Sequence, residues 1–197
     1  MDEKLAALLK ELELFSNAND SRATDRGEKM LNITPDTGAF LALLVRALRA
    51  RRILEIGTSN GYSTLWLAYA VRSLEGRIVT VEKSRAKSEM AQANFARAGL
   101  AMWIEPHLID AGSFLKAQPP ASFDFVFLDS DRGEYVAWWQ DLQRVLASGG
   151  MMVVDNAVSH AGELQEFTAA VRAASGYLTA LVPVGKGEFL ILKESSK

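Results

Sequence analysis

The sequence contains no cysteine and only two histidines. Without cysteine the chain cannot form a disulfide, bind a metal through thiolates or use a catalytic thiol. The two imidazoles, His107 and His160, are too few for the nitrogen- and sulfur-rich ligand sets typical of Zn²⁺, whereas Mg²⁺ and similar cations bind oxygen. A metal site in this chain is therefore expected to consist of oxygen ligands.

A long apolar run and a strong net charge are also absent. No stretch approaches the ~20 apolar residues of a membrane-spanning helix, and the acidic start Met1-Asp2-Glu3 is unlike a signal peptide. The formal net charge of −2 gives no electrostatic reason to bind nucleic acid or an anionic membrane. We therefore expect a cytoplasmic protein with neither nucleic acid nor membrane as a partner.

The composition is typical of a globular domain. The 197 residues, 49% hydrophobic and 23% charged, suffice for one domain with a sizeable core. Leucines at helical spacing predict an amphipathic helix over residues 2–15, which packs either on its own domain or on a second subunit. The polar segment 16–30 is expected to be a linker or a lid. We predict a single domain over 1–197, in which residues 1–31 form the N-terminal helix and this segment.

Beyond residue 33, helical and strand patterns alternate. Helices are expected over residues 35–50, 62–74, 84–98, 112–117, 134–146 and 159–174. Strands are expected over residues 53–56, 77–81, 102–109, 123–128, 151–154, 177–184 and 188–193. This alternation predicts an α/β fold, a doubly wound and mostly parallel seven-stranded sheet with helices on both faces. The last two strands, joined through Gly185-Lys186-Gly187, predict a C-terminal antiparallel hairpin.

A glycine-bracketed turn, Gly57 to Gly61, joins the first strand to a helix start, where backbone N–H groups and the helix dipole can hold polar groups of a ligand. Glu55 lies in the apolar strand before it and must meet a cationic or hydrogen-bond-donating partner. The turn lacks the lysine of a P-loop and two of the three glycines of a dinucleotide fingerprint. It matches the G-x-S-x-G nucleophile elbow through Ser59, or else forms the first loop of a nucleotide-derived cofactor site.

Acidic residues recur at the carboxyl ends of the expected strands, where an open parallel sheet binds its ligands. These residues are Glu55, Glu82, Asp110, Asp129 and Asp155. Asp110 is also explained as a helix cap. Glu82 can bind both hydroxyls of a ribose, and Asp129, Asp155 and Asn156 offer hard oxygen ligands to Mg²⁺ or a similar cation.

Five sequence blocks between residues 32 and 162 resemble, in order and spacing, the cation-dependent O-methyltransferases of the catechol and caffeoyl-coenzyme A type. The blocks are I-T-P-D-T-G-A-F-L, L-E-I-G-T-S-N-G-Y-S, V-T-V-E, F-V-F-L-D-S-D-R-G-E-Y and V-V-D-N. The resemblance implies a class I, Rossmann-like methyltransferase fold that binds S-adenosylmethionine. It also implies a homodimer that methylates a hydroxyl of a small aromatic vicinal diol beside a metal-bound oxygen.

The resemblance implies roles for individual residues. Those around the methionine part of the donor are Ile33, Glu55, Gly57, Thr58 and Ser63. Glu82 binds the ribose, Ala111 and Gly112 border the adenine, and Asp131 lies close to the donor's amino group. The metal, Mg²⁺ or alternatively Mn²⁺ or Ca²⁺, is bound by Asp129, Asp155 and Asn156. Asp129 also belongs to the donor-binding and catalytic residues, and His160 faces the substrate.

Arg132 departs from the family pattern, which has a lysine general base just after the D-x-D segment. A guanidinium stays protonated and cannot accept a proton. We hypothesise that the metal acidifies the acceptor hydroxyl and that Arg132 holds the resulting oxyanion. Alternatives are a different class of acceptor, loss of the metal, or a non-catalytic protein that binds S-adenosylmethionine.

A serine hydrolase is the remaining alternative, because Ser59, Asp129 or Asp155, and His160 follow the chain order of an α/β-hydrolase triad. The expected sheet has no strand before the elbow. No earlier strand–loop connection is therefore left to supply the second N–H of an oxyanion hole. The context that would confirm the motif is missing, and this interpretation also leaves Glu82 and Asn156 unexplained.

Overall fold

The computed structural model describes residues 1–195 and contains a seven-stranded sheet in the order β3-β2-β1-β4-β5-β7-β6. The strands are β1 (Arg52–Ile56), β2 (Arg77–Glu82), β3 (Ile104–Leu108), β4 (Phe123–Leu128), β5 (Leu146–Val154), β6 (Tyr177–Val182) and β7 (Glu188–Lys193). The first five strands run parallel, whereas β7 runs antiparallel to both β5 and β6. The predicted doubly wound sheet with its closing antiparallel hairpin is confirmed.

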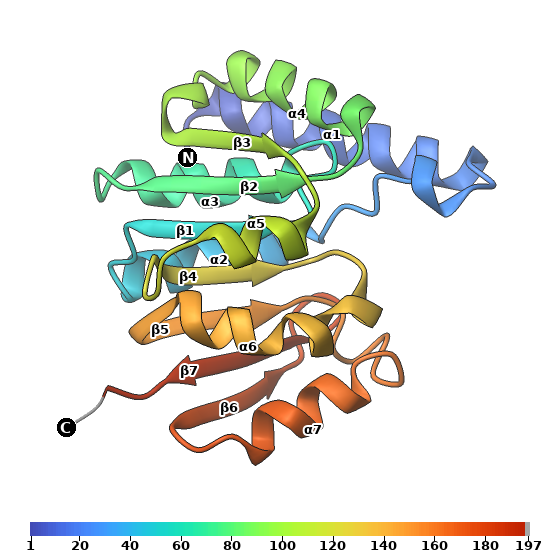
Figure 1. Ribbon diagram of the computed structural model, residues 1–197. Helices are drawn as coiled ribbons and strands as arrows, with labels where there is room; N and C mark the ends of the chain where they lie inside the picture. Colours follow the sequence, from blue (N-terminus) through green and yellow to red (C-terminus); the bar gives the residue numbers. More distant parts are fainter. Residues whose placement is uncertain (196–197) are drawn as a thin grey trace.

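Helices cover both faces of this sheet (Figure 1). They are α1 (Glu3–Arg22), α2 (Pro35–Ala47), α3 (Tyr62–Arg72), α4 (Arg85–Ala98), α5 (Ala111–Ala117), α6 (Tyr135–Val145) and α7 (Gln165–Ala173), with 3₁₀ turns η1 (Arg26–Glu28), η2 (Ala101–Trp103) and η3 (Arg132–Glu134). Successive strand residues point to opposite faces. Ile53 and Phe127 therefore belong to the core under α1–α4, while Leu54 and Leu128 belong to the core under α5–α7.

The N-terminal helix is longer than the sequence predicts. Its leucine stripe is buried in the core of its own chain, but the helix continues to Arg22 instead of ending at residue 15. The expectation of a linker or lid over 16–30 is therefore wrong for its first part. Asp20, on the added turns, accepts hydrogen bonds from the backbone N–H groups of Met30 (2.7 Å) and Leu31 (2.8 Å). This tertiary contact holds a polar segment in place that has little apolar patterning of its own.

Two further boundaries differ for similar reasons. Strand β5 begins at Leu146 because that residue pairs with Phe123 of β4, so Gly149 and Gly150 lie within the strand rather than in a turn before it. Helix α7 begins at Gln165, later than residue 159. The preceding residues are held as turns by the β6–β7 hairpin, since Ala157 N donates to the carbonyl oxygen of Gly187 at 2.7 Å.

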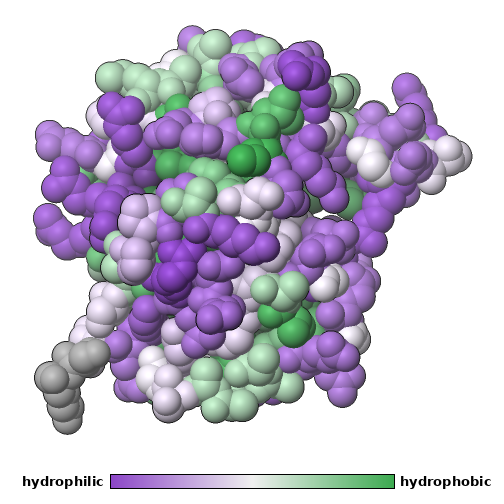
Figure 2. Space-filling view, viewed as in Figure 1, coloured by the Kyte–Doolittle hydropathy of each residue, from purple (hydrophilic) through white to green (hydrophobic). Residues whose placement is uncertain are grey.

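One face of the molecular surface is mostly polar, as the ordinary share of charged residues in the composition predicts. Figure 2 shows polar and charged side chains over most of the face that carries α5–α7, with apolar side chains in smaller areas between them. Among residues 1–195, no helix combines the length and the apolar character that crossing a membrane requires.

Candidate functional site

The carboxyl ends of β1, β2, β4 and β5 meet at one rim of the sheet, on the right of Figure 1. Ile56 pairs with both Val81 and Leu128, and Leu128 pairs with Val154. The residues that follow these positions are Gly57, Glu82, Asp129 and Asp155. The register of the parallel strands therefore brings the expected acidic residues to the same edge.

Glu55 is fully buried one residue before the end of β1. Its carboxylate accepts hydrogen bonds from the hydroxyls of Ser63 (2.6 Å), Thr64 (2.5 Å) and Thr80 (2.6 Å). Thr80 in turn lies 2.6 Å from the hydroxyl of Thr58. Burial raises the pKa of Glu55 to about 7, and the three hydroxyl donors oppose that rise. The donors that the buried Glu55 requires are therefore hydroxyl groups. The hydroxyls of Ser63 and Thr58 both belong to this hydrogen-bond network.

The turn after β1 is shaped by close contact with β4 and by Glu82. Gly57 has φ +106°, and a Cβ there would lie 1.9 Å from the carbonyl oxygen of Asp129. Both carboxylate oxygens of Glu82 accept backbone N–H groups, from Ser59 at 2.9 Å and from Ser84 at 2.8 Å. Glu82 thus fixes the loops after β1 and β2 while remaining partly exposed at the rim.

The positions of Ser59 and His160 do not support the serine hydrolase interpretation. The hydroxyl of Ser59 donates to the carbonyl oxygen of Met30 at 2.7 Å. His160 Nδ1 instead lies 2.8 Å from the hydroxyl of Ser159. A nucleophile and its base must be within hydrogen-bond reach, and Ser59 is bound to backbone. The contact also brings Met30, and with it the segment leading to the buried Ile33, against the turn after β1.

Asp129, Asp155 and Glu188 stand side by side on three neighbouring strands. Leu128 and Val154 are parallel partners, so Asp129 and Asp155 follow each other across β4 and β5. Val154 pairs with Phe189 in the antiparallel ladder, which sets Asp155 opposite Glu188. The sequence analysis missed Glu188. The predicted hairpin contained the signal, because the first residue of an antiparallel strand enters the sheet at the rim where the parallel strands end.

Burial raises the pKa of all three carboxyls, and for Asp129 and Glu188 the charge of neighbouring carboxylates adds to the rise. For Asp129, burial is the largest cause, followed by the negative charges of Asp155 and Glu55, while Arg132 and Lys186 act in the opposite direction. Burial and then the charge of Asp155 raise the pKa of Glu188 to about 10. Burial and neighbouring charges thus favour the protonated forms of Asp129 and Glu188.

Within residues 1–195, the carboxylate of Glu188 accepts a single hydrogen bond. Its Oε1 accepts from the hydroxyl of Thr37 at 3.1 Å. Its Oε2 is buried and has no donor within residues 1–195. Glu188 and Asp155 are 0% and 4% exposed, and the negative charge of Asp155 favours the protonated form of Glu188.

The donor set at this rim suits a hard divalent cation. Asp129, Asp155 and Asn156 supply only oxygen ligands, which Mg²⁺, Mn²⁺ and Ca²⁺ prefer. Asn156, with φ +65°, donates its Nδ2 to a carboxylate oxygen of Asp155. In the described part of the chain, no three histidine, aspartate or glutamate side chains are gathered as a formed metal site. The chemistry of these ligands fits a divalent cation. Their carboxylates lie side by side along the rim rather than gathered as a formed site.

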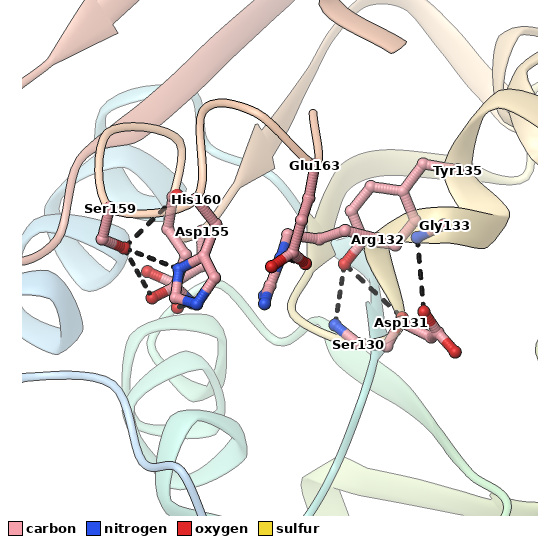
Figure 3. Close-up of polar contacts among 10 residues, drawn as sticks. Ser130, Asp131, Arg132, Gly133, Tyr135, Asp155, Ser159, His160 and Glu163 are labelled. Atoms are coloured by element: carbon pink, nitrogen blue, oxygen red, sulfur yellow. Dashed lines mark hydrogen bonds and ion pairs between the residues drawn. The ribbon is translucent and has the colours of Figure 1, made fainter. Parts of the chain in front are cut away.

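Arg132 links the two loops that follow β4 and β5 (Figure 3). Its side chain is 5% exposed, and Nε donates to Glu163 Oε2 at 2.8 Å. His160 belongs to the same segment as Glu163, between β5 and α7, and lies beside Asp155 in Figure 3. Asp131 is exposed and caps η3 through the N–H of Gly133 at 3.3 Å. The hydroxyl of Tyr135 accepts from Ser130 N at 2.7 Å, which fixes the start of this loop.

Ala111 and Gly112 lie at the start of α5, next to β3 in the sequence. Asp110 caps this helix, accepting from Ser113 N at 2.8 Å, as its interpretation as a cap predicts. A Cβ on Gly112 would lie 3.0 Å from Trp138 Nε1. Trp138 is therefore a neighbour of the expected adenine position that the sequence analysis did not identify, because helical spacing alone does not tell which aromatic ring reaches the rim.

A family model described as O-methyltransferase matches residues 4–192. The chain belongs to the O-methyltransferase family. A catechol O-methyltransferase of Mycobacterium tuberculosis is 39% identical over 145 residues, covering 73% of this chain. The match spans 66% of that relative's length, just under two thirds.

Solved structures resemble the whole fold. The O-methyltransferase of Bacillus cereus, in complex with SAH, has a TM-score of 0.80 at 28% identity, covering 95% of this chain and 91% of its own. The O-methyltransferase TomG of Streptomyces achromogenes, in complex with SAM, has a TM-score of 0.78 at 29% identity, covering 99% and 91%. The class I methyltransferase fold implied by the sequence resemblance is confirmed.

Proposed function

We propose that this protein is an S-adenosylmethionine-dependent O-methyltransferase that acts on a hydroxyl of a small aromatic vicinal diol with the help of a divalent cation. The observation that carries the proposal is the rim itself. A family O-methyltransferase fold presents Glu82 at the end of β2 and the Asp129–Asp155 pair at the ends of β4 and β5. One end of the rim thus suits a ribose and the other a cation-bound acceptor.

The donor is assigned to the β1–β2 side of the rim. Two related solved structures hold SAH or SAM. In this chain Glu82 would bind the ribose hydroxyls, and Gly112 with Trp138 would border the adenine. The donor carries a sulfonium and an ammonium, so the acidic rim favours it electrostatically. Glu55 would act on the methionine part through its hydroxyl network, since Ser63 and Thr64 cover its carboxylate.

The acceptor is assigned to the β4–β5 side. Asp129, Asp155 and Asn156 would hold the cation, which when bound orients the acceptor and lowers the pKa of its hydroxyl. Arg132 would hold the developing oxyanion, and His160 would face the rest of the acceptor. Methyl transfer is a direct displacement, so aligning the oxygen with the methyl and the sulfur is the main task of these residues.

A binding measurement and a methylation assay test the proposal. Calorimetry with S-adenosylmethionine should give saturable binding that Glu82→Gln weakens about tenfold, the loss of a charge-assisted hydrogen bond. Incubation with 3,4-dihydroxybenzoate, donor and Mg²⁺ should give a singly methylated product, and a chelator should abolish it. Binding without transfer to any diol would favour the non-catalytic alternative, and no donor binding would refute the proposal.

Arg132→Lys tests the hypothesis about the oxyanion. Lysine restores a side chain that can act as a base, so the rate and its dependence on pH should both change. An unchanged rate and pH profile would refute a role for Arg132 at the reacting oxygen. A homodimer in the cytoplasm completes the proposal, and light scattering after size exclusion tests the dimer.

A further inference from the structure

We infer that Glu163 is a positioning residue of the acceptor site, which holds the Arg132 guanidinium in the orientation that the reacting oxygen requires. This inference rests on the proposed function and deepens it, because it explains how an arginine can serve where the family has a lysine. Glu163 lies in the turns between β5 and α7, and the sequence resemblance implies no role for it. Its carboxylate reaches across to the loop after β4 (Figure 3).

The contact orients the guanidinium from one side only. Nε donates to Glu163 Oε2 at 2.8 Å, and the remaining nitrogens, Nη1 and Nη2, make no hydrogen bond to the described part of the chain. Arg132 follows Asp129 by three residues in the loop after β4, at the rim that carries the acidic residues. Glu163 thus occupies the Nε edge of the guanidinium, and the two Nη groups have no partner in the described part of the chain.

Stability alone does not explain the pair. Arg132 is 5% exposed, but Glu163 is 48% exposed, so solvent screens the pair from the Glu163 side and reduces its contribution to folding. Arginine has a long side chain with high rotamer entropy, yet a guanidinium binds oxygen well when its planar fork is fixed in advance. Orientation of Arg132 is therefore the larger effect of Glu163, and it should appear in turnover rather than in unfolding.

Glu163→Gln is the main test, with Glu166→Gln as the matched control. Glu166 is an exposed glutamate in the first turn of α7, three residues further on. With a cation-loaded enzyme and 3,4-dihydroxybenzoate, we expect Glu163→Gln to lower kcat about tenfold or more, the loss of one charge-assisted hydrogen bond. Donor affinity should match the wild type, thermal stability should fall by far less than turnover does, and the control should match the wild type in every respect.

A pH profile and a spectroscopic signal separate positioning from a structural role. If Arg132 stabilises the oxyanion, kcat should rise with pH as the acceptor hydroxyl ionises, and Glu163→Gln should shift this rise to higher pH. Glu163→Asp should restore part of the rate. The Arg132 Nε–H resonance, assigned by its loss in Arg132→Lys, should exchange slowly in the wild type and about tenfold faster in Glu163→Gln.

The outcomes distinguish failure of this inference from failure of the proposed function. An unchanged kcat and pH profile in Glu163→Gln, or an Nε–H resonance that exchanges equally slowly in it, would overturn the positioning role. A variant that loses turnover only because it unfolds would also overturn it. If the wild type methylates no diol, the proposed function fails, and the Nε–H exchange still decides whether Glu163 holds Arg132.

Discussion

Asp155 and Glu188 face each other across the antiparallel strands β5 and β7, and both carboxyls are buried. Like charges placed opposite each other destabilise a sheet. The chain keeps this arrangement at the rim where its parallel strands end, beside Asp129. A pair that is unfavourable for folding is consistent with selection for binding at this place, because strained or charged clusters persist at functional sites.

Replacing Glu188 by Gln should stabilise the protein, increasingly as pH rises. The pKa of Glu188 is raised from 4.5 to about 10 in the folded protein. Between these values the folded state holds a proton that the unfolded state has released, so this group makes stability fall as pH rises. In urea unfolding with a chelator present, the variant should gain about 1–3 kcal/mol at pH 8 and little at pH 4. Parallel stability profiles from pH 4 to 9 would contradict this.

Thr80→Val should destabilise the protein, whereas Thr80→Ser should have a small effect. Valine keeps the shape but removes the hydroxyl that donates to the buried Glu55 at 2.6 Å. The expected loss is about 1–3 kcal/mol in the free energy of unfolding. Since the pKa of Glu55 is about 7, the loss should grow from pH 6 to pH 8 as the carboxylate ionises. A loss that is the same at both pH values would show that Glu55 does not titrate there.

Gly57→Ala should be far more damaging than Gly99→Ala. Both glycines have positive φ, +106° and +68°. A Cβ on Gly57 would overlap the carbonyl oxygen of Asp129, whereas one on Gly99 meets no heavy atom within 4 Å. We expect a loss of about 1 kcal/mol at Gly99, where only the backbone conformation is unfavourable, and about 3 kcal/mol or more at Gly57. Thermal unfolding measures both, and equal losses would contradict the close approach of β1 and β4.

Asp20→Ala should loosen the segment that leads to the donor side of the rim. Asp20 accepts from the N–H groups of Met30 and Leu31, and Met30 contacts Ser59 through its carbonyl oxygen. Loss of these bonds should speed amide exchange at both residues about tenfold. Asp25→Ala, which removes only the contact to Gly27 N within η1, is the control. Unchanged exchange in Asp20→Ala would show that the segment is held by other contacts.

The sequence by itself determined the alternation of strands and helices and the position of acidic residues at strand ends. Both follow from local patterns, because buried parallel strands are continuous apolar runs and each ends where a polar residue appears. The blocks around Glu55, Glu82, Asp129 and Asp155 also carry the family resemblance. Their meeting at one rim follows once the strands are parallel, since all the carboxyl ends then lie on the same side.

Only the tertiary structure decided which side chains join those acids. Glu188 becomes the neighbour of Asp155 through a pairing between strands more than thirty residues apart in sequence, and Glu163 reaches Arg132 from a loop of irregular shape. The end of α1 at Arg22 likewise depends on Asp20 binding Met30 and Leu31. Such contacts join residues that are distant along the chain, so neither periodicity nor local propensity specifies them, and packing of the complete fold does.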